Sequence, residues 1–252
     1  VAVGALVFLI VRWRRNVLVS RLEKERLEYR SRMLALEQQT LNSSLNRHFI
    51  FNALNSIQYY INRKDRLSAN KYLSSFAKLI RKNLDSSETN LTSLQEEIDR
   101  LNLYLELEHM RFQGKFEYAI EVDEDVDTES IQVPSMLLQP FLENSIWHGI
   151  LPKNAPGKVT VRISRENGHE VMFTITDDGI GIDTSMANKD LEQDHISKGM
   201  RITGSRIELI QKMTGQHVQL LGPYELKGAG QEVLGTEVKI ILPLSFEGFF
   251  AN

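Results

Sequence analysis

The sequence contains no cysteine among its 252 residues. This absence excludes a disulfide scaffold, a thiolate zinc site and a cysteine nucleophile, and it is typical of proteins in a reducing compartment. A large excess of charge of one sign is also missing, because 30 Lys and Arg residues are balanced by 33 Asp and Glu residues, which leaves a formal net charge of −3. A chain with this balance has no bulk electrostatic basis for binding nucleic acid, so we expect no nucleic-acid partner.

Two common phosphate-transfer motifs are missing as well. The chain has no G-x-x-x-x-G-K-S/T segment, and it has no H-R-D segment followed by D-F-G. These motifs hold the phosphates in P-loop enzymes and in protein kinases of the Ser/Thr/Tyr type. Any nucleotide site in this chain must therefore be of another type.

The apolar run at the start of the chain is short. Residues 1–11 are apolar, whereas about 20 such residues are needed to cross a bilayer. The segment Arg12-Trp13-Arg14-Arg15 follows, and aromatic and basic residues in this position are typical of a cytoplasmic membrane interface. We expect residues 1–16 to be the end of a truncated transmembrane helix in the inner (cell) membrane, with the remainder cytoplasmic. A signal-peptide core or a buried terminal helix is the alternative.

Apolar residues recur three and four positions apart from Val19 to Ile61. This spacing predicts one long helix that dimerises through a coiled-coil-like seam. A polar break at residues 62–66 precedes a second amphipathic helix, and two such hairpins would form a four-helix bundle in a homodimer. A third helix should open at Ser93, because Glu96 stands three residues later in a capping-box spacing.

The pattern changes after Gly114. Alternating apolar residues predict strands, Asn167-Gly168 predicts a hairpin turn, and the remaining stretches predict two helices. The expected order is strand 116–122, helix 134–149, hairpin 159–175, an irregular polar stretch 183–197, helix 206–213 and strand 238–242. We therefore predict an α + α+β chain: a helical-hairpin dimerisation bundle at residues 17–114, followed at 115–252 by an α/β sandwich with a mixed sheet covered by helices on one face.

Asp177, Gly179 and Gly181 follow directly on a predicted strand. Glycines in this spacing let the backbone turn tightly and approach a flat ligand, and a carboxylate at the strand end can accept a hydrogen bond from an exocyclic amine. An ordinary acidic glycine turn would have the same sequence. The pattern alone is therefore compatible with two interpretations, a ligand site and a purely structural turn.

A second group of polar residues lies on the predicted helix 134–149. Asn144 and His148 are four residues apart, so they should share one face. The Asn144 oxygen would suit a Mg²⁺ ion that bridges phosphate oxygens, and a solvent-exposed helix edge is the alternative. Small-residue turns at Lys198-Gly199 and Gly235-Thr236 could hold phosphate through backbone N–H groups.

Taken in order, these segments resemble the LytS-like sensor histidine kinases, whose ATP-binding part has the Bergerat fold of gyrase, Hsp90 and MutL. The resemblance covers roughly residues 40–243. Four segments carry it: Asn46-Arg47-His48-Phe49-Ile50-Phe51-Asn52-Ala53-Leu54-Asn55; Gln139-Pro140-Phe141-Leu142-Glu143-Asn144 with His148-Gly149; Asp177-x-Gly179-x-Gly181; and Gly235-Thr236.

The resemblance implies ATP and Mg²⁺ as cofactors and a role for each matching residue. His48 would be the phosphoacceptor, with Glu143 as a base and Asn52 as an orienting residue. Asn144 would bind the metal and Asp177 would read adenine. The remaining nucleotide-binding set is His148, Gly179, Gly181, Lys198, Gly199 and Thr236.

The implied function is a homodimeric autokinase that passes its phosphoryl group to an Asp of a response regulator receiver domain. Three positions depart from the family pattern: Arg47 stands where Pro is usual, Asp178 where Asn is usual, and Trp147 where many relatives have Lys. Arg47 and Trp147 favour an alternative, a nucleotide-binding signalling scaffold with weak catalysis. A Bergerat ATPase that does not phosphorylate itself is a third possibility, and the segment around His48 argues against it.

Overall fold

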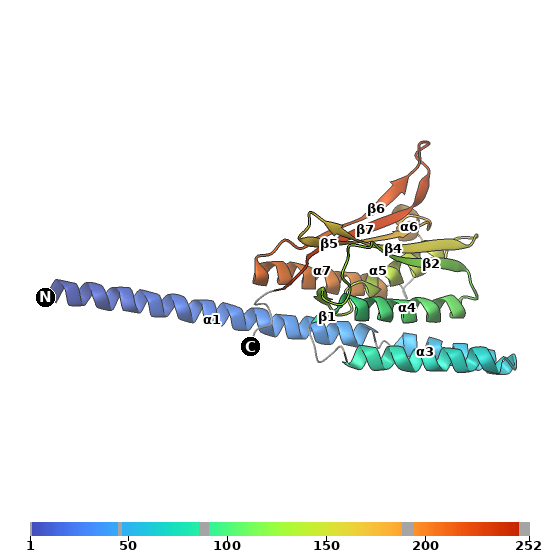
Figure 1. Cartoon of the computed structure of the whole chain (residues 1–252), viewed down its shortest axis with the longest axis horizontal. Coiled ribbons are helices and arrows are strands. Elements are labelled where there is room, and N and C mark those ends of the chain that lie inside the picture. Colours follow the sequence, from blue (N-terminus) through green and yellow to red (C-terminus); the bar gives the residue numbers. More distant parts are fainter. Residues whose placement is uncertain (1, 45–46, 86–90, 188–193, 247–252) are drawn as a thin grey trace.

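The computed structural model describes residues 2–44, 47–85, 91–187 and 194–246. Helix α1 extends far from the rest of the molecule, and the hairpin of α2 and α3 lies beyond its C-terminal end (Figure 1). The helices of this half are α1 (Ala2–Ser44), α2 (Arg47–Asn62), α3 (Arg66–Asp85) and α4 (Leu94–Arg111). Among the described residues, no helix combines the length and the apolar character that a membrane span requires.

The prediction of one continuous helix from Val19 to Ile61 is wrong. Helix α1 ends at Ser44, and a separate helix, α2, begins at Arg47. The end of α1 carries Asn42, Ser43 and Ser44. The short polar side chains of Asn and Ser compete for backbone hydrogen bonds, which favours helix ends over helix interiors.

The predicted hairpin of α2 and α3 is present. Lys64 adopts a positive φ of 60° in the turn, and Asp65 Oδ1 accepts a hydrogen bond from the backbone N–H of Ser68 at 3.0 Å, which caps α3. The Tyr60 hydroxyl donates to the carbonyl oxygen of Met110 at 2.8 Å. This bond connects the hairpin to the end of α4.

Helix α4 begins as the capping box predicts. Ser93 Oγ accepts a hydrogen bond from the backbone N–H of Glu96 at 3.2 Å. One side of α4 packs on α3 and α2, and the other side packs toward strand β2. Its apolar face is buried at Leu94, Ile98, Leu101 and Leu105.

A five-stranded mixed sheet forms the centre of the C-terminal half, in the order β2-β4-β5-β7-β6. Strands β2 and β4 are parallel, and the other neighbours are antiparallel. The strands are β2 (Phe116–Val122), β4 (Gly157–Glu166), β5 (Glu170–Asp177), β6 (Gln219–Lys227) and β7 (Val233–Pro243), and a separate two-stranded ladder pairs β1 (Leu91–Ser93) with β3 (Gln132–Pro134).

The hairpin between β4 and β5 has the predicted turn. Asn167 and Gly168 both adopt positive φ values, 50° and 75°, as a two-residue turn of the Asn-Gly type requires. Along β5, Val171, Phe173 and Ile175 are buried on one face. The antiparallel register with β7 then sets Asp177, the last residue of β5, opposite Thr236.

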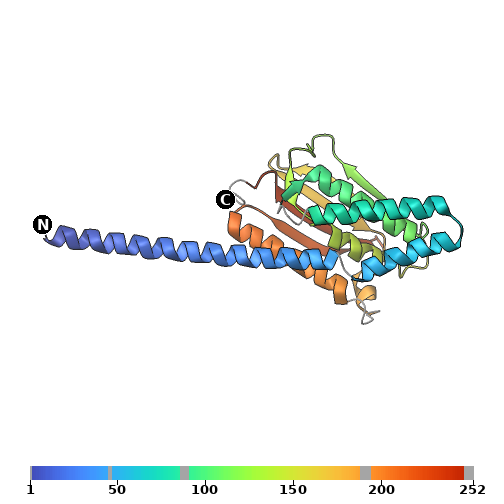
Figure 2. The ribbon, with the colours of Figure 1, turned by 90° about the horizontal axis from the view of Figure 1, so that it is seen from below.

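Helices cover one face of this sheet, as predicted (Figure 1). They are α4, α5 (Gln139–Asn144), the π-helix η1 (Ser145–Ile150) and α7 (Asp194–Thr214), and the short α6 (Ile182–Ala187) follows β5. The C-terminal part of α1 lies beside α7 in both views (Figures 1 and 2). Met33 of α1 is buried in the same core as Ile207 and Leu209 of α7.

Several elements differ from the sequence prediction. Helix α6 and the start of α7 at Asp194 fall within the stretch 183–197 that was predicted to be irregular, and the short strands β1 and β3 were not predicted. Strand β6 was not predicted, because Gly222-Pro223 interrupts its pattern; the strand tolerates them because it lies at the sheet edge, with a register irregularity between Leu221 and Tyr224. The helix predicted from residue 134 begins only at Gln139. It is preceded by a turn in which Met136 has a positive φ of 57°.

Candidate active site

Asp177 is the centre of the candidate site. Its side chain is buried, with 2% of the residue surface exposed, and its Oδ1 accepts a hydrogen bond from the Gly179 N–H at 2.9 Å while Oδ2 accepts one from the Thr236 hydroxyl. Burial raises the pKa of Asp177, and the hydrogen bonds from Thr236, Ser145 and Gly179 oppose that rise. The protein therefore holds a buried acceptor group in a fixed orientation at the end of β5.

Glycines surround this carboxylate where larger residues would not fit. A Cβ on Gly179 would lie 2.4 Å from the backbone of Gly149, and a Cβ on Gly149 would lie 2.7 Å from Asp177 Oδ1. Gly235 has a φ of +145°, and its Cβ would lie 1.8 Å from the Asp177 carbonyl oxygen. The glycines let the surrounding backbone pack closely against the carboxylate, and a buried carboxylate of this kind can accept a hydrogen bond from the exocyclic amine of a flat ligand such as adenine.

The turn after Gly179 is fixed by a residue that sequence analysis missed. Glu225 Oε1 accepts hydrogen bonds from the backbone N–H groups of Ile182, at 2.9 Å, and Asp183, at 3.2 Å. Gly181 adopts a φ of +82°, and a Cβ there would lie 2.8 Å from Glu225 Oε1. Glu225 belongs to β6, the strand that the sequence did not predict, so no sequence signal pointed to it.

Asp178 does not add an uncompensated charge to the site. Its Oδ1 accepts a hydrogen bond from the Lys158 N–H at 2.8 Å, and its Oδ2 forms an ion pair with Lys153 Nζ at 3.1 Å. An Asp in place of the usual Asn brings one more negative charge to this position. The Lys153 ammonium offsets that charge.

The segment from Gln139 to Ile150 carries the motif with Asn144 and His148, and it contacts Asp177. Asn144 is the last residue of α5, and His148 lies four residues later in η1, where the helix widens to π geometry; both are half-buried. A hydrogen bond from Ser145 reaches Asp177, and the Ile180 N–H donates to the Gly149 carbonyl oxygen at 3.0 Å. The structure therefore joins the two motifs, and π-turns of this kind are frequent at functional sites.

Glu143 has the protonation behaviour of an acid–base group. Its pKa is raised to about 7, mainly by burial and also by the negative charge of Glu108, and a hydrogen bond from Gln139 opposes the rise. Gln139 Nε2 donates to Glu143 Oε1 at 2.8 Å. A carboxyl group that titrates near neutral pH is suited to accept a proton at cellular pH.

Trp147 packs against α4. Its ring lies 5.5 Å from the Phe112 ring, edge to face, and the Arg111 guanidinium lies 4.7 Å from each of these two rings. Arg111 also approaches Glu108 Oε1 at 3.5 Å. The residue that replaces the usual Lys is therefore part of a cation–π cluster that binds η1 to the end of α4.

Phe49 anchors the start of α2. Its ring lies 5.9 Å from Phe76 and 6.3 Å from Tyr104, and Tyr104 is fully buried and receives a hydrogen bond from Trp147. A row of aromatic side chains thus connects the segment next to His48 with η1. This contact could not be predicted from the sequence, because Phe49 and Tyr104 lie on different helices.

The remaining candidate residues are placed only in part. Asn52 is half-buried one turn after His48 in α2, and Gly199 is buried in α7. The side chains of His48 and Lys198 lie outside the described part of the structure. The geometry between His48 and the Asp177 cradle thus stays a prediction.

Comparisons with known proteins agree with this architecture. Residues 36–116 match the family described as histidine kinase, and residues 131–245 match the family described as histidine kinase-, DNA gyrase B- and HSP90-like ATPase. The sensor histidine kinase YpdA of Escherichia coli (strain K12) is 29% identical over 90% of this chain and 38% of its own length. The sensor protein LytS of Bacillus subtilis (strain 168) is 35% identical over 65% of this chain and 27% of its own length.

A histidine kinase domain from Erythrobacter litoralis EL346, known from a solved structure, is 16% identical with a TM-score of 0.45, and the match covers 88% of this chain and 100% of that chain. The chain spans less than half the length of YpdA and LytS. The two family matches follow each other along the chain in the order that the motifs indicated. The chain therefore carries a histidine kinase segment followed by a histidine kinase-, DNA gyrase B- and HSP90-like ATPase domain, and it is similar to the LytS-like sensor histidine kinases.

Proposed function

We propose that this chain is the cytoplasmic part of a membrane sensor histidine kinase that phosphorylates His48 from Mg-ATP and passes the phosphoryl group to an Asp of a response regulator. The observation that carries the proposal is the buried Asp177 carboxylate, held by Gly179 and Thr236 within a wall of glycine backbone. This arrangement supports the recognition of adenine. Its family context supports a histidine as the acceptor of the phosphoryl group.

The nucleotide would be held by residues from β5 and the turn after it, and from α5, η1, α7 and β7. Asp177 would accept a hydrogen bond from the adenine amine, and Asn144 would provide an oxygen ligand to Mg²⁺. Mg²⁺ would supply positive charge at the phosphates of the bound nucleotide. The other residues proposed to contact the nucleotide are His148, Gly179, Gly181, Lys198, Gly199 and Thr236.

In the transfer step the bond between the γ-phosphorus and the bridging oxygen of ATP breaks, and a bond forms between that phosphorus and a nitrogen of His48. ADP leaves with the electron pair of the broken bond. Glu143 would take the imidazole proton, as its pKa of about 7 allows, and Asn52 would orient the ring. The protein contributes mostly positioning and charge, since phosphoryl transfer requires little covalent chemistry of its side chains.

A homodimer is part of the proposal. Helices α2 and α3 expose apolar side chains at Leu54, Ile61, Leu67 and Leu73, and exposed apolar surface of this kind marks an association face. The proposed units are a membrane-proximal segment at residues 1–16, a dimerisation and phosphotransfer unit at 17–114 and an ATP-binding unit at 115–252. Exposed Trp13, among Arg12, Arg14 and Arg15, supports attachment to the inner membrane.

Incubation with γ-labelled ATP and Mg²⁺ tests the proposal. The wild-type protein is expected to acquire a label that is stable to alkali and labile to acid, as phosphohistidine is. His48→Gln should remove the label completely, because it removes the acceptor nitrogen. His169→Gln replaces an exposed histidine in the turn between β4 and β5 and should leave the label unchanged.

Two other outcomes would contradict the proposal. Nucleotide binding without any label would indicate a signalling scaffold. Release of free phosphate without labelled protein would indicate an ATPase that does not phosphorylate itself.

A further inference from the structure

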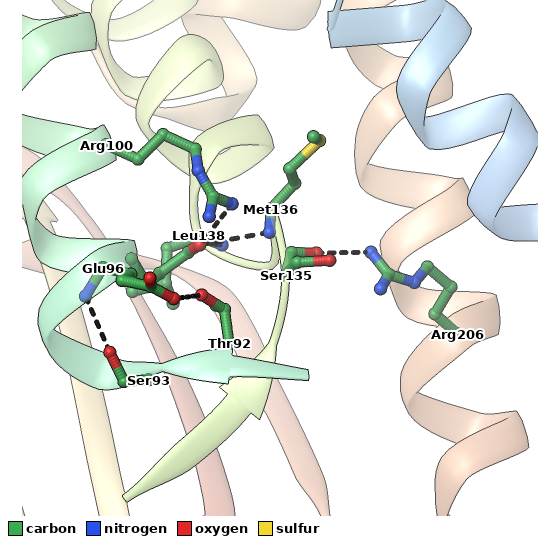
Figure 3. A network of polar contacts seen from close by, with 9 residues as sticks. Thr92, Ser93, Glu96, Arg100, Ser135, Met136, Leu138 and Arg206 are labelled. Carbon is green, nitrogen blue, oxygen red and sulfur yellow. Dashed lines mark hydrogen bonds and ion pairs between the residues drawn. The ribbon is translucent and has the colours of Figure 1, made fainter. Parts of the chain in front are cut away.

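The turn that leads into α5 is held from two sides by buried charged residues (Figure 3). It comprises residues 135–138 between β3 and α5. Met136 adopts a φ of 57° in this turn, a left-handed conformation that is strained for a residue other than glycine. Leu138 is the N-cap residue of α5, and its apolar side chain cannot accept a hydrogen bond. The turn therefore depends on groups outside it.

Glu97 of α4 supplies the acceptors from one side. It is fully buried, and its Oε2 accepts a hydrogen bond from the Met136 N–H at 3.1 Å while Oε1 accepts one from the Leu138 N–H at 3.4 Å. Arg100 Nη1 lies 2.8 Å from Glu97 Oε2 and compensates the buried charge. Glu97 thus caps the start of α5 from a different helix.

Arg206 of α7 supplies a donor from the other side. Its Nη1 donates a hydrogen bond to the Ser135 carbonyl oxygen at 3.0 Å, and the residue is 2% exposed. Removing a guanidinium from water is costly unless its hydrogen bonds are replaced. An apolar side chain at this position would avoid that cost, but it could not donate a hydrogen bond to the Ser135 carbonyl oxygen. The buried guanidinium is therefore consistent with a role in fixing the turn.

The consequence for the site follows from the length of α5, which has six residues. Glu143 and Asn144 are its last two residues, so any shift of the turn moves both of them relative to Asp177. We infer that Glu97 and Arg206 are positioning residues for phosphoryl transfer: they set the location of Glu143 and Asn144 through the turn at 135–138. This inference rests on the proposed function.

The test uses Glu97→Gln and Arg206→Met in the whole chain, with Glu208→Gln and Lys212→Met as matched controls at exposed positions of α7. Without Mg²⁺, the affinity for ATP should stay within about twofold of wild type in all four variants, because Asp177 reads the adenine. Mg²⁺ should strengthen ATP binding in wild type and in both controls. That strengthening should be lost in Glu97→Gln and Arg206→Met, and their rate of labelling should fall by about 10- to 100-fold.

Arg206→Lys keeps the positive charge and a donor, and it should recover most of the Mg²⁺ effect. If Arg206→Met does not fold, Glu97→Gln decides the matter. An unchanged Mg²⁺ effect alongside a normal labelling rate in Glu97→Gln, or in a folded Arg206→Met, would overturn the inference. Equal losses of ATP affinity with and without Mg²⁺ would also overturn it, because they would indicate a general structural role. Wild-type protein that binds Mg-ATP without being labelled would refute the proposed function, while the Mg²⁺ comparison would still test the positioning role.

Discussion

Asp177→Asn is expected to weaken ATP binding by about 30- to 150-fold, because it removes a charged acceptor whose hydrogen bonds contribute about 2 to 3 kcal/mol. The Asn side chain has the same shape but presents an NH₂ group where the carboxylate presents an oxygen. The NH₂ group would then face a donor in place of an acceptor: the Gly179 N–H, the Thr236 hydroxyl or the adenine amine. Isothermal titration calorimetry with ATP measures the effect directly.

Asp178→Asn is the matched control for this variant. Asp178 is the next residue in the chain, but its carboxylate interacts with Lys153 and the Lys158 N–H. We expect Asp178→Asn to bind ATP within a fewfold of wild type. Equal losses in the two variants, or full affinity in Asp177→Asn, would remove Asp177 from the role of adenine reader.

Glu143→Gln is expected to slow His48 phosphorylation by about 10²- to 10⁴-fold, the usual contribution of a general base. The base must be deprotonated to act, so the wild-type rate should rise as the pH rises through about 7, the raised pKa of Glu143. His48 must also be neutral, and an unperturbed histidine has a pKa of about 6.5. In the wild-type protein, the rise of the labelling rate with pH should therefore reflect the deprotonation of both Glu143 and His48. In Glu143→Gln, the rise should reflect the deprotonation of His48 alone.

Rapid-quench labelling between pH 5.5 and pH 8.5 provides the profile. Glu124→Gln, at an exposed position, should leave both the rate and the profile unchanged. If Glu143→Gln reached the wild-type maximal rate and kept the wild-type dependence on pH, another group would have to accept the proton.

Local patterns in the sequence predicted much of the fold. The alternation in β4, β5 and β7, the Asn167-Gly168 turn and the capping box at Ser93 are each decided by residues close together in the chain, and the structure confirms them. The break after Ser44 and the edge strand β6 were missed. At the break, the preference of Asn and Ser for helix ends outweighed the apolar periodicity, and in β6 the position at the sheet edge outweighed the breaker residues.

The candidate site divides in the same way. Asp177, Gly179 and Thr236 were predicted from short motifs, and the structure brings them into contact. The supports of the site were not predictable, because Glu97 and Arg206 contact residues 39 and 71 positions away in the chain. The position of a charged residue in the sequence of α4 or α7 does not indicate which backbone groups its side chain will contact in the folded protein. The pairing of Asp178 with Lys153 was hidden for the same reason.

The most direct test is whether bound nucleotide brings its phosphates to His48. NMR spectra of protein labelled with ¹⁵N-histidine would be recorded with Mn²⁺ and a non-hydrolysable ATP analogue, and His48→Gln would assign the His48 ring signals. The account predicts that the paramagnetic ion broadens the His48 signals, and that Asp177→Asn abolishes this broadening. Sharp, unchanged His48 signals in the presence of broadened His148 signals would contradict it.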